Sequence, residues 1–492
     1  MSDLPALLVA LPLLGSTLAF LAGLTRSESG WPVALVTTAV QVVGAAVLAS
    51  RAFESTVSYV VGGFEAPFGI ELYIDGLSAT MALLVAVVAF AVLAYSRVAG
   101  PRSNAFYAAY LLLVAGLTGM SITGDVFNMY VFLEITGLAA YALVASGEGG
   151  RSARAALKYL IVGTIGASLF LLGIGYAFIA TGTLNMADLA DQLAAVGHTD
   201  PLVQAAFGLL VVGLFVKVAV FPLHAWQPDA YAGAPDSVSA LISALVSTVA
   251  AYALIRIVYT VFTVEFLQAN PAARSLLVAG AVVSIVFGSV LAVSQTEIKA
   301  MLAYSSVSQF GLVVGAVALA NEPALIGATI HLVGHAVMKG GLFLTAGLIA
   351  TATGARTVDG YEGLIQRLPL GAGVFGLLAL SMVGVPPAVG FVGKWYIALG
   401  AVEASAWPLA VVILASTLLT LAYFARILER MFFRDATEET GTAPPAAADG
   451  GVSRPSIGMT ATVVVAAVAA VVLGVLAFEY GQLLEPTIEA LL

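Results

Sequence analysis

Seven ionisable side chains stand inside long apolar stretches of this sequence. They are Glu134, Lys217, His224, His331, His335, Lys339 and Lys394. A charged residue at the centre of a membrane-spanning helix costs about 2.5 to 3.5 kcal/mol on insertion scales, so such residues face the bundle interior, have partners and mark ion or proton routes. Carboxyl, ammonium and imidazole groups all take up and release protons. Their types and positions therefore predict a proton relay across a membrane.

Glu134 lies in the middle of the apolar segment TGDVFNMYVFLEITGLAAYAL. Its proton affinity would depend on whether a cation is close, because a nearby cation favours the carboxylate and desolvation disfavours it. The alternative is a structural charge or hydrogen bond between helices. Lys217, about sixteen residues into a span that starts at Pro201, is the predicted partner. This depth argues against a lysine that extends to the membrane surface. His224 either joins the relay or binds backbone groups freed by the proline next to it.

The segment HLVGHAVMK places His331, His335 and Lys339 at positions i, i+4 and i+8 of one helix. These positions form a single stripe with neighbours about 6 Å apart along the axis, a spacing that water can bridge. Polar packing between helices is one alternative and a metal site is another. HxxxH alone is a weak metal signal, and here it lacks the glutamate of HExxH and any cysteine. We expect a relay with neither a metal nor a cofactor.

Lys394, in VGFVGKW, is the last buried charge in chain order and is predicted to be the terminal donor or acceptor, facing the opposite aqueous side. A lysine that extends to the membrane surface is the alternative. Ser305, Ser306 and Ser308 in the segment SQTEIKAMLAYSSVSQFG either hold water or pack against a neighbouring helix. No catalytic triad, phosphate loop or dinucleotide motif accompanies these residues, so the sequence does not predict an enzyme.

The composition is that of an integral membrane protein. Of the 492 residues 61% are hydrophobic and 10% charged, with a mean hydropathy of +1.03. Apolar runs of about 17 to 25 residues recur along the whole chain, each long enough to cross a bilayer. The absence of cysteine excludes thiolate metal sites, iron–sulfur clusters and disulfides. The net charge of −9 and the lack of a basic cluster exclude nucleic-acid binding.

We expect an all-α fold of about fourteen transmembrane helices in one membrane domain, residues 1–492. The spans are predicted to start near Leu4, Trp31, Leu77, Phe106, Asp125, Lys158, Pro201, Ser237, Arg274, Ala300, Pro323, Leu368, Trp407 and Ile457. Two connections are longer than the rest. Residues 51–75 contain Gly62, Gly63 and Pro67 and are compatible with a hairpin, whereas residues 434–455 have the composition of a flexible loop.

Positive charge is distributed unevenly between the two sets of alternate loops. One set holds 13 lysines and arginines, and the other holds Arg51, Arg256 and Arg274. Because cytoplasmic loops carry the excess of positive charge, this bias supports the predicted order of spans. It also predicts a multi-pass protein of the cell membrane with both termini outside.

Proline interrupts two spans, the seventh at Pro222 and the twelfth at Pro386 and Pro387. Proline removes a backbone donor and crowds the preceding turn, so each span is predicted to be a broken helix with freed carbonyl groups. Each break falls in the fourth helix of a five-helix unit, residues 104–260 and 271–432, with three helices before (1–103) and one after (457–480). An odd number of helices inverts the second unit relative to the first, as in many secondary transporters.

Five motifs together resemble one superfamily: TGDVFNMYVFLE, VKVAVFPLHAWQPDAYAGAP, EIKAMLAYSSVSQFG, HAVMKGGLFL and GVPPAVGFVGKW. They are similar to the antiporter-like membrane subunits shared by multisubunit cation/proton antiporters and respiratory complex I, over about helices four to thirteen. The sequence around Glu134 and Lys394 most resembles that of the D subunit of Mrp-type sodium/proton antiporters. The resemblance implies a subunit that works only with partner subunits, in the lipid bilayer, and exchanges sodium for protons.

The resemblance also implies roles for single residues. Glu134 and Lys217 match the pair thought to control proton uptake, His331 and His335 match polar positions of the central helix, and Lys394 matches the lysine at the exit. Many relatives carry a lysine or histidine in the eighth helix, where this chain has Ser247 and Thr248. A hydroxyl does not hold an excess proton near neutral pH, so this step would need ordered water.

Two alternatives stay open at the level of the sequence. One is an equivalent proton-pumping subunit in a complex I or membrane hydrogenase, where a redox module supplies the energy. The other is a structural scaffold with a vestigial channel, suggested by Thr248. The sequence does not place a site for sodium or another cation.

Overall fold

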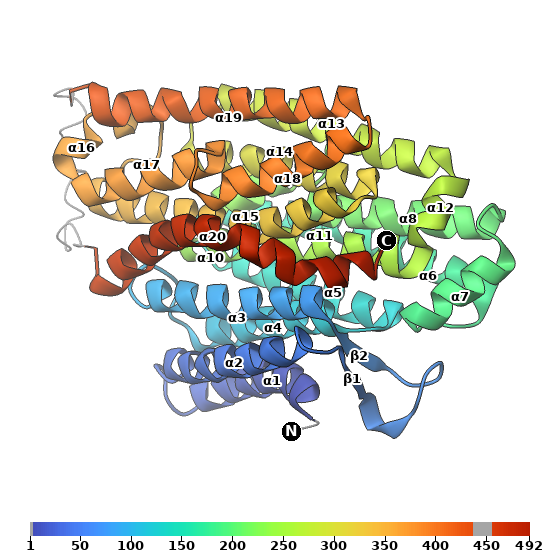
Figure 1. The fold of residues 1–492 in the computed structure, drawn as a ribbon. Coiled ribbons are helices and arrows are strands. Elements are labelled where there is room, and N and C mark those ends of the chain that lie inside the picture. The colour runs from blue at the N-terminus through green and yellow to red at the C-terminus, as the bar shows by residue number, and fades with distance from the viewer. Residues whose placement is uncertain (1–2, 436–454) are drawn as a thin grey trace.

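Helices account for nearly all of the structure, a computed structural model that describes residues 3–435 and 455–492 (Figure 1). The predicted flexible loop at 434–455 lies almost entirely outside the described residues. The first half of the chain, through the first broken span, consists of α1 (Leu4–Gly23), α2 (Gly30–Ala52), β1 (Val57–Val60), η1 (Val61–Gly63), β2 (Glu71–Ile74), α3 (Gly76–Ser96), α4 (Asn104–Ile122), α5 (Val126–Ala145), α6 (Gly149–Thr181), α7 (Met186–Val196), α8 (Pro201–Val218) and α9 (Gln227–Gly233).

The second half begins with a long span that consists of five consecutive helical segments. It continues with helices that pack around the centre of the bundle. The elements are α10 (Asp236–Leu241), η2 (Ile242–Val246), α11 (Ser247–Arg256), η3 (Ile257–Phe262), α12 (Thr263–Ala269), α13 (Pro271–Ser294), α14 (Ile298–Leu319), α15 (Glu322–Thr353), η4 (Asp359–Tyr361), α16 (Leu364–Arg367), α17 (Pro369–Val383), α18 (Val389–Glu403), α19 (Trp407–Phe433) and α20 (Ile457–Glu489).

The structure confirms the prediction of an all-α membrane protein. Thirteen helices among the described residues are long and apolar enough to cross a bilayer. The remaining predicted span, the twelfth, consists of the two short helices α17 and α18 on either side of the Pro386–Pro387 break. The largest difference in a starting point is at α6, which begins at Gly149 rather than near Lys158. Its first turns carry Arg151 and Arg154, which the search for apolar runs left out.

Both broken helices are present where proline predicted them. The helix α8 ends at Val218, and Ala219 then adopts a left-handed conformation with φ of 66° before α9 begins. The helix α17 ends at Val383 and is followed by Gly384 with φ of 102°, a backbone conformation that glycine adopts without strain. The eighth span also contains two π-helical segments, η2 and η3, which the sequence did not predict. This span continues to Ala269, beyond the predicted unit boundary at 260.

The predicted hairpin is also present, with β1 antiparallel to β2 and Val57 opposite Ile74. It marks one end of the bundle, where both ends of the chain lie (Figure 1). The start of α1 lines a pocket with β1, and the end of α20 lines another with β2. The two termini therefore share one side, and the prediction that this side is external stays a prediction. The centre of the bundle is formed by α11, α14 and α15, which are almost wholly buried.

Candidate proton-relay site

Glu134 of α5 and Lys217 of α8 lie together inside the bundle. The Lys217 Nζ and Glu134 Oε1 atoms are 3.6 Å apart, and the lysine side chain is 6% exposed while the carboxylate is 28% exposed. Glu134 Oε1 is buried and has no hydrogen-bond partner among the described residues. The predicted partners thus form an ion pair that is slightly longer than a hydrogen bond, with one unsatisfied oxygen.

Tyr141 of α5 is a third member of this site that the sequence reasoning missed. Lys217 Nζ donates to the Tyr141 hydroxyl at 3.3 Å and lies 5.9 Å from the ring centroid. Gly137 leaves the space that this contact needs, because a Cβ there would lie 3.3 Å from Lys217 Nζ. A signal did exist, since Gly137 and Tyr141 follow Glu134 by three and seven residues and so share its helix face.

The break after α8 frees carbonyl groups, as predicted, and the side chains of two residues outside α8 donate hydrogen bonds to them. Trp226 Nε1 donates to the Val216 carbonyl at 2.8 Å, and Ser247 Oγ donates to the Lys217 carbonyl at 3.4 Å. Trp226 also stacks on Tyr159 with ring centroids 4.0 Å apart, and Tyr159 packs edge-on against Tyr141. The break is therefore held in a fixed shape directly beside Lys217.

His224 lies on the other side of the break, and its ring contacts are with aromatic residues. Its ring stacks on Phe221 at 4.8 Å and lies 5.8 Å from the ring of Tyr304 on α14. Phe221 in turn stacks on Phe287 of α13. His224 is buried with Nδ1 unpartnered among the described atoms. The structure therefore places it toward the second five-helix unit, apart from the Glu134–Lys217 pair.

The three residues of the α15 stripe are all buried, at 1% exposure or less. The His331 and His335 ring centroids are 6.4 Å apart, and no described group hydrogen-bonds to either imidazole. Lys339 Nζ donates to the Leu302 carbonyl at 2.8 Å and to Ser305 Oγ at 2.5 Å. Within the described chain no group of three or more potential metal ligands is present, so the two histidines lack the further ligands that a metal site needs.

The three serines of α14 have different kinds of partner. Ser305 contacts Lys339 and also accepts a hydrogen bond from the Tyr423 hydroxyl of α19 at 2.9 Å. Ser308 packs against α13, with its Oγ 2.7 Å from Ser289 Oγ. Ser306 bonds to a carbonyl of its own helix. Ser305 therefore belongs to the polar site, and Ser308 to the helix–helix interface.

Lys394 of α18 binds the backbone that the second break exposes. Its Nζ donates to the carbonyls of Met382 at 2.9 Å and Val383 at 3.0 Å, which end α17. The C-terminus of a helix carries partial negative charge, so these carbonyls can stabilise an ammonium group without a carboxylate. Lys394 is 6% exposed, which argues against a lysine that extends to the membrane surface. Next to it, a Cβ on Gly393 would lie 2.9 Å from His331 Cβ, so α18 directly contacts the stripe.

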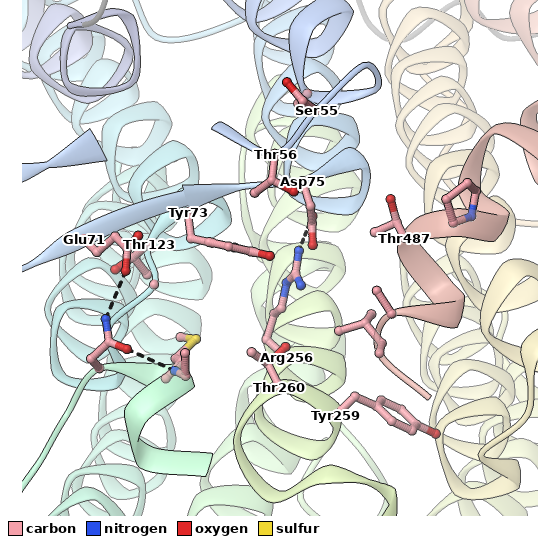
Figure 2. Close-up of a pocket in the computed structure, with 18 of the residues that line it drawn as sticks. Ser55, Thr56, Glu71, Tyr73, Asp75, Thr123, Arg256, Tyr259, Thr260 and Thr487 are labelled. Atoms are coloured by element: carbon pink, nitrogen blue, oxygen red, sulfur yellow. Dashed lines mark hydrogen bonds and ion pairs between the residues drawn. The ribbon is translucent and has the colours of Figure 1, made fainter. Parts of the chain in front are cut away.

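Another ion pair lies at the hairpin end, where both of its side chains line a cavity of about 460 Å³ (Figure 2). Arg256 pairs with Asp75 and donates to Ser78 Oγ at 2.8 Å and to the Tyr252 hydroxyl at 2.9 Å. Burial disfavours the Asp75 carboxylate, but the Arg256 guanidinium and hydrogen bonds from Ser78 hold its pKa below the ordinary value. The charge count placed Arg256 in a loop, and this was wrong. It is a buried residue, 3% exposed, of the eighth span, which the apolar pattern ended too early.

A bundle with two broken helices and a line of buried lysines and histidines defines a class of ion-translocating membrane subunit. Residues 123–420, more than half of the chain, match the family described as NADH:quinone oxidoreductase/Mrp antiporter, TM. Residues 59–97 match the N-terminal family of NADH-ubiquinone oxidoreductase (complex I) chain 5. The chain belongs to the NADH:quinone oxidoreductase/Mrp antiporter family, as the motifs predicted.

Individual relatives come from both branches of this family. The chain is 45% identical over 430 residues to the N subunit of NADH-quinone oxidoreductase from Desulforudis audaxviator, covering 85% of this chain and 84% of the relative. It is 33% identical over 382 residues to the D subunit of the Na(+)/H(+) antiporter from Bacillus subtilis, covering 77% and 76%.

Two solved structures are similar over nearly their whole length. A chain of an archaeal membrane-bound sulfane sulfur reductase is 30% identical with a TM-score of 0.90, covering 99% of this chain and 98% of the other. A chain of the Mrp complex from a Dietzia species is 26% identical with a TM-score of 0.89, covering 100% and 97%. The fold is thus shared by subunits of redox complexes and of antiporters.

Proposed function

We propose that this chain is a proton-translocating, antiporter-like subunit of a multisubunit complex in the cell membrane. Protons would pass along Glu134, Lys217, the α15 stripe and Lys394. The observation that carries the proposal is the loose pair of Glu134 and Lys217, in which the lysine is buried, the two charged groups are 3.6 Å apart and the buried Glu134 Oε1 has no hydrogen bond among the described residues. A pair that serves only stability would be expected to satisfy its buried atoms, because an unsatisfied buried oxygen is costly.

The chemistry follows from the surroundings of each charge. While Glu134 is ionised it attracts the Lys217 ammonium, and once Glu134 is protonated this attraction is lost and Lys217 releases its proton more readily. Lys339 and Lys394 are held by carbonyl and hydroxyl oxygens, with no carboxylate in contact with them in the described ranges. Two ammonium groups repel each other strongly in a medium of low dielectric constant, so charging one favours deprotonation of the other.

Two energy sources are supported by different relatives. Exchange of sodium for protons, as in an Mrp-type antiporter, is supported by the antiporter relative from Bacillus subtilis and by the Mrp complex structure. A redox-driven complex is supported by the higher identity to the NADH-quinone oxidoreductase relative and by the sulfane sulfur reductase structure. Both use the same proton route in this chain. Sodium is thus a proposed substrate of the complex in the first case only.

The test uses the complex purified from native membranes with its partner subunits and reconstituted into liposomes that contain a pH-sensitive dye. Glu134→Ala and Lys217→Ala should each abolish proton movement in a complex that still assembles. Normal proton movement in both variants would refute the relay. Proton movement driven by a sodium gradient alone identifies the antiporter, whereas a requirement for an electron donor identifies the redox complex.

A further inference from the structure

The eighth span packs against both α8, which carries Lys217, and α15, which carries the stripe. Its α11 segment begins with Ser247 and Thr248, which are not ionisable, and both are fully buried. Ser247 Oγ contacts the Lys217 carbonyl, whereas Thr248 Oγ1 has no hydrogen-bond partner in the described part of the chain. A proton route through this span therefore needs hydroxyl groups and neighbours that connect them.

Three polar side chains form a closed triangle at this point. Gln227 Nε2 lies 3.1 Å from the Tyr231 hydroxyl and 3.3 Å from Ser247 Oγ, and these two hydroxyl oxygens are 3.3 Å apart. All three side chains have no exposed surface. Gln227 and Tyr231 belong to α9, immediately after the first break, and Ser247 begins α11. The break and the eighth span thus meet through hydrogen-bonding groups in an otherwise apolar interior.

The triangle extends from the Lys217 helix to α15. At one corner Ser247 donates to the Lys217 carbonyl. At another the Tyr231 ring packs edge-on against Phe343 of α15, with centroids 5.7 Å apart. Phe343 follows Lys339 by one helical turn. The helices are also close here, because a Cβ on Gly340 would lie 3.3 Å from Ala244 Cβ of η2.

Two features of the triangle point to a dynamic role and not to packing alone. Gln227 Oε1 is buried without a partner, as is Thr248 Oγ1, so both have capacity to bind a water molecule. The π-helical segment η2 ends at Val246, directly before Ser247, and such segments occur frequently at functional sites.

We propose that Tyr231 and Ser247, oriented by Gln227, carry protons across the eighth span between Lys217 and the α15 stripe. This inference rests on the proposed function. A hydroxyl can accept one proton on its oxygen while it gives its own proton to the next acceptor. In a concerted transfer the Lys217 ammonium gives one proton through water to the Ser247 oxygen, the Ser247 proton passes to the Tyr231 oxygen, and the Tyr231 proton passes through water to an imidazole of the α15 stripe. Lys217 is left neutral and the imidazole becomes an imidazolium. Bonds formed and broken balance, and neither hydroxyl keeps a charge.

Tyr231→Phe in the reconstituted complex is the decisive variant, because it keeps the ring that packs on Phe343 and removes only the hydroxyl. We expect a fall in proton movement of at least about tenfold, within the range that positioned proton donors and acceptors contribute. Gln227→Leu should have a similar effect. The matched control is Tyr259→Phe, whose equally buried hydroxyl bonds to the Val317 carbonyl outside the triangle. Proton movement should be unchanged in this control.

Rescue separates a relay from a structural role. Adding Thr248→Lys to Tyr231→Phe should restore proton movement, because an amine in the eighth span supplies a titratable group that bypasses the lost hydroxyl. A merely structural defect would not be restored by a second buried substitution. If the double variant does not assemble, the solvent deuterium isotope effect of Tyr231→Phe decides. It should exceed the wild-type effect when proton transfer limits the rate, and an unchanged effect would overturn the proposal.

The outcomes keep the two proposals apart. If Glu134→Ala abolishes proton movement and both Tyr231→Phe and Gln227→Leu behave as wild type, the triangle is not part of the route and the proposed function stands. If Glu134→Ala itself moves protons normally, the proposed function fails and this inference fails with it.

Discussion

Two ion pairs in the interior of the bundle, Arg256–Asp75 and Lys217–Glu134, differ in how completely their atoms are satisfied. Arg256 contacts Asp75, Ser78 and Tyr252, and the Tyr252 hydroxyl donates onward to the Ser121 carbonyl. Lys217 has a neutral hydroxyl at 3.3 Å and a carboxylate at 3.6 Å. The first pair joins α3, α4 and the eighth span through short bonds, whereas the second leaves Glu134 Oε1 without a bond among the described residues.

This contrast indicates which pair is structural and which can exchange protons. Arginine keeps its charge at any physiological pH, and a fully bonded buried pair is strongly disfavoured from opening. Lysine loses its proton when its surroundings favour the neutral form, and a loosely held lysine can do so without breaking a network. We therefore interpret Arg256–Asp75 as a structural ion pair at the hairpin end and Glu134–Lys217 as the pair that exchanges protons in the relay.

The largest effect on transport is expected from Lys217→Met, which keeps the length of the side chain and removes the charge. Proton movement should fall by about 100-fold or more, in line with the loss of a proton donor, and the complex should still assemble. Lys158→Met is the control, because Lys158 pairs with Asp229 at the surface. Proton flux in the reconstituted complex measures both, and equal loss in the control would contradict the assignment.

For Arg256→Met we expect the opposite result, a loss of stability and no direct effect on proton movement. Removing one partner of a buried pair leaves Asp75 uncompensated and should lower the free energy of unfolding by about 3 to 5 kcal/mol. Denaturant unfolding of the purified chain in detergent measures this difference. Arg274→Met is the matched control, since Arg274 is exposed and bonds only to the Ala318 carbonyl among the partners described for it. A loss of proton movement without a loss of stability in Arg256→Met would reverse our interpretation of the two pairs.

Acid should weaken the Arg256–Asp75 ion pair. The pKa of Asp75 is lowered in the folded protein, so its contribution to stability is present above the unfolded value of about 3.9 and is lost as the pH falls through the lower folded value. Asp75→Asn should remove this part of the acid dependence. Thermal unfolding of both proteins from about pH 6 down to about pH 3, which spans the onset of carboxyl protonation, measures the difference. Parallel curves would show that Asp75 contributes nothing to it.

The smallest effect is expected for Tyr141→Phe. Lys217 loses its hydrogen bond to the hydroxyl but keeps the aromatic face and the Glu134 carboxylate. The loss of one such hydrogen bond corresponds to roughly 0.5 to 1.5 kcal/mol, which is a change of about two- to tenfold in proton movement. Tyr176→Phe, at an exposed position of α6, is the control. A complete loss of transport would place Tyr141 on the route itself.

The sequence by itself determined the order of the spans, both breaks and most of the ionisable residues inside the bundle, although it placed Arg256 in a loop. A bilayer requires about twenty apolar residues per helix and leaves no water for free backbone groups. An apolar run such as the one that starts at Pro201 therefore predicts a spanning helix, and a proline such as Pro222 inside a run predicts a break in that helix. For the same reason, a charge such as Glu134 in the middle of an apolar run is visible without any structure.

Only the tertiary structure decided which charge meets which partner. The contact between Glu134 and Lys217, the carbonyls that hold Lys394 and the pair of Arg256 with Asp75 all join separate helices. Hydropathy records whether a residue tolerates lipid but not how far or at what rotation one helix packs against another. Helix packing sets those distances through small residues such as Gly137 and Gly393, and proton transfer depends on these distances.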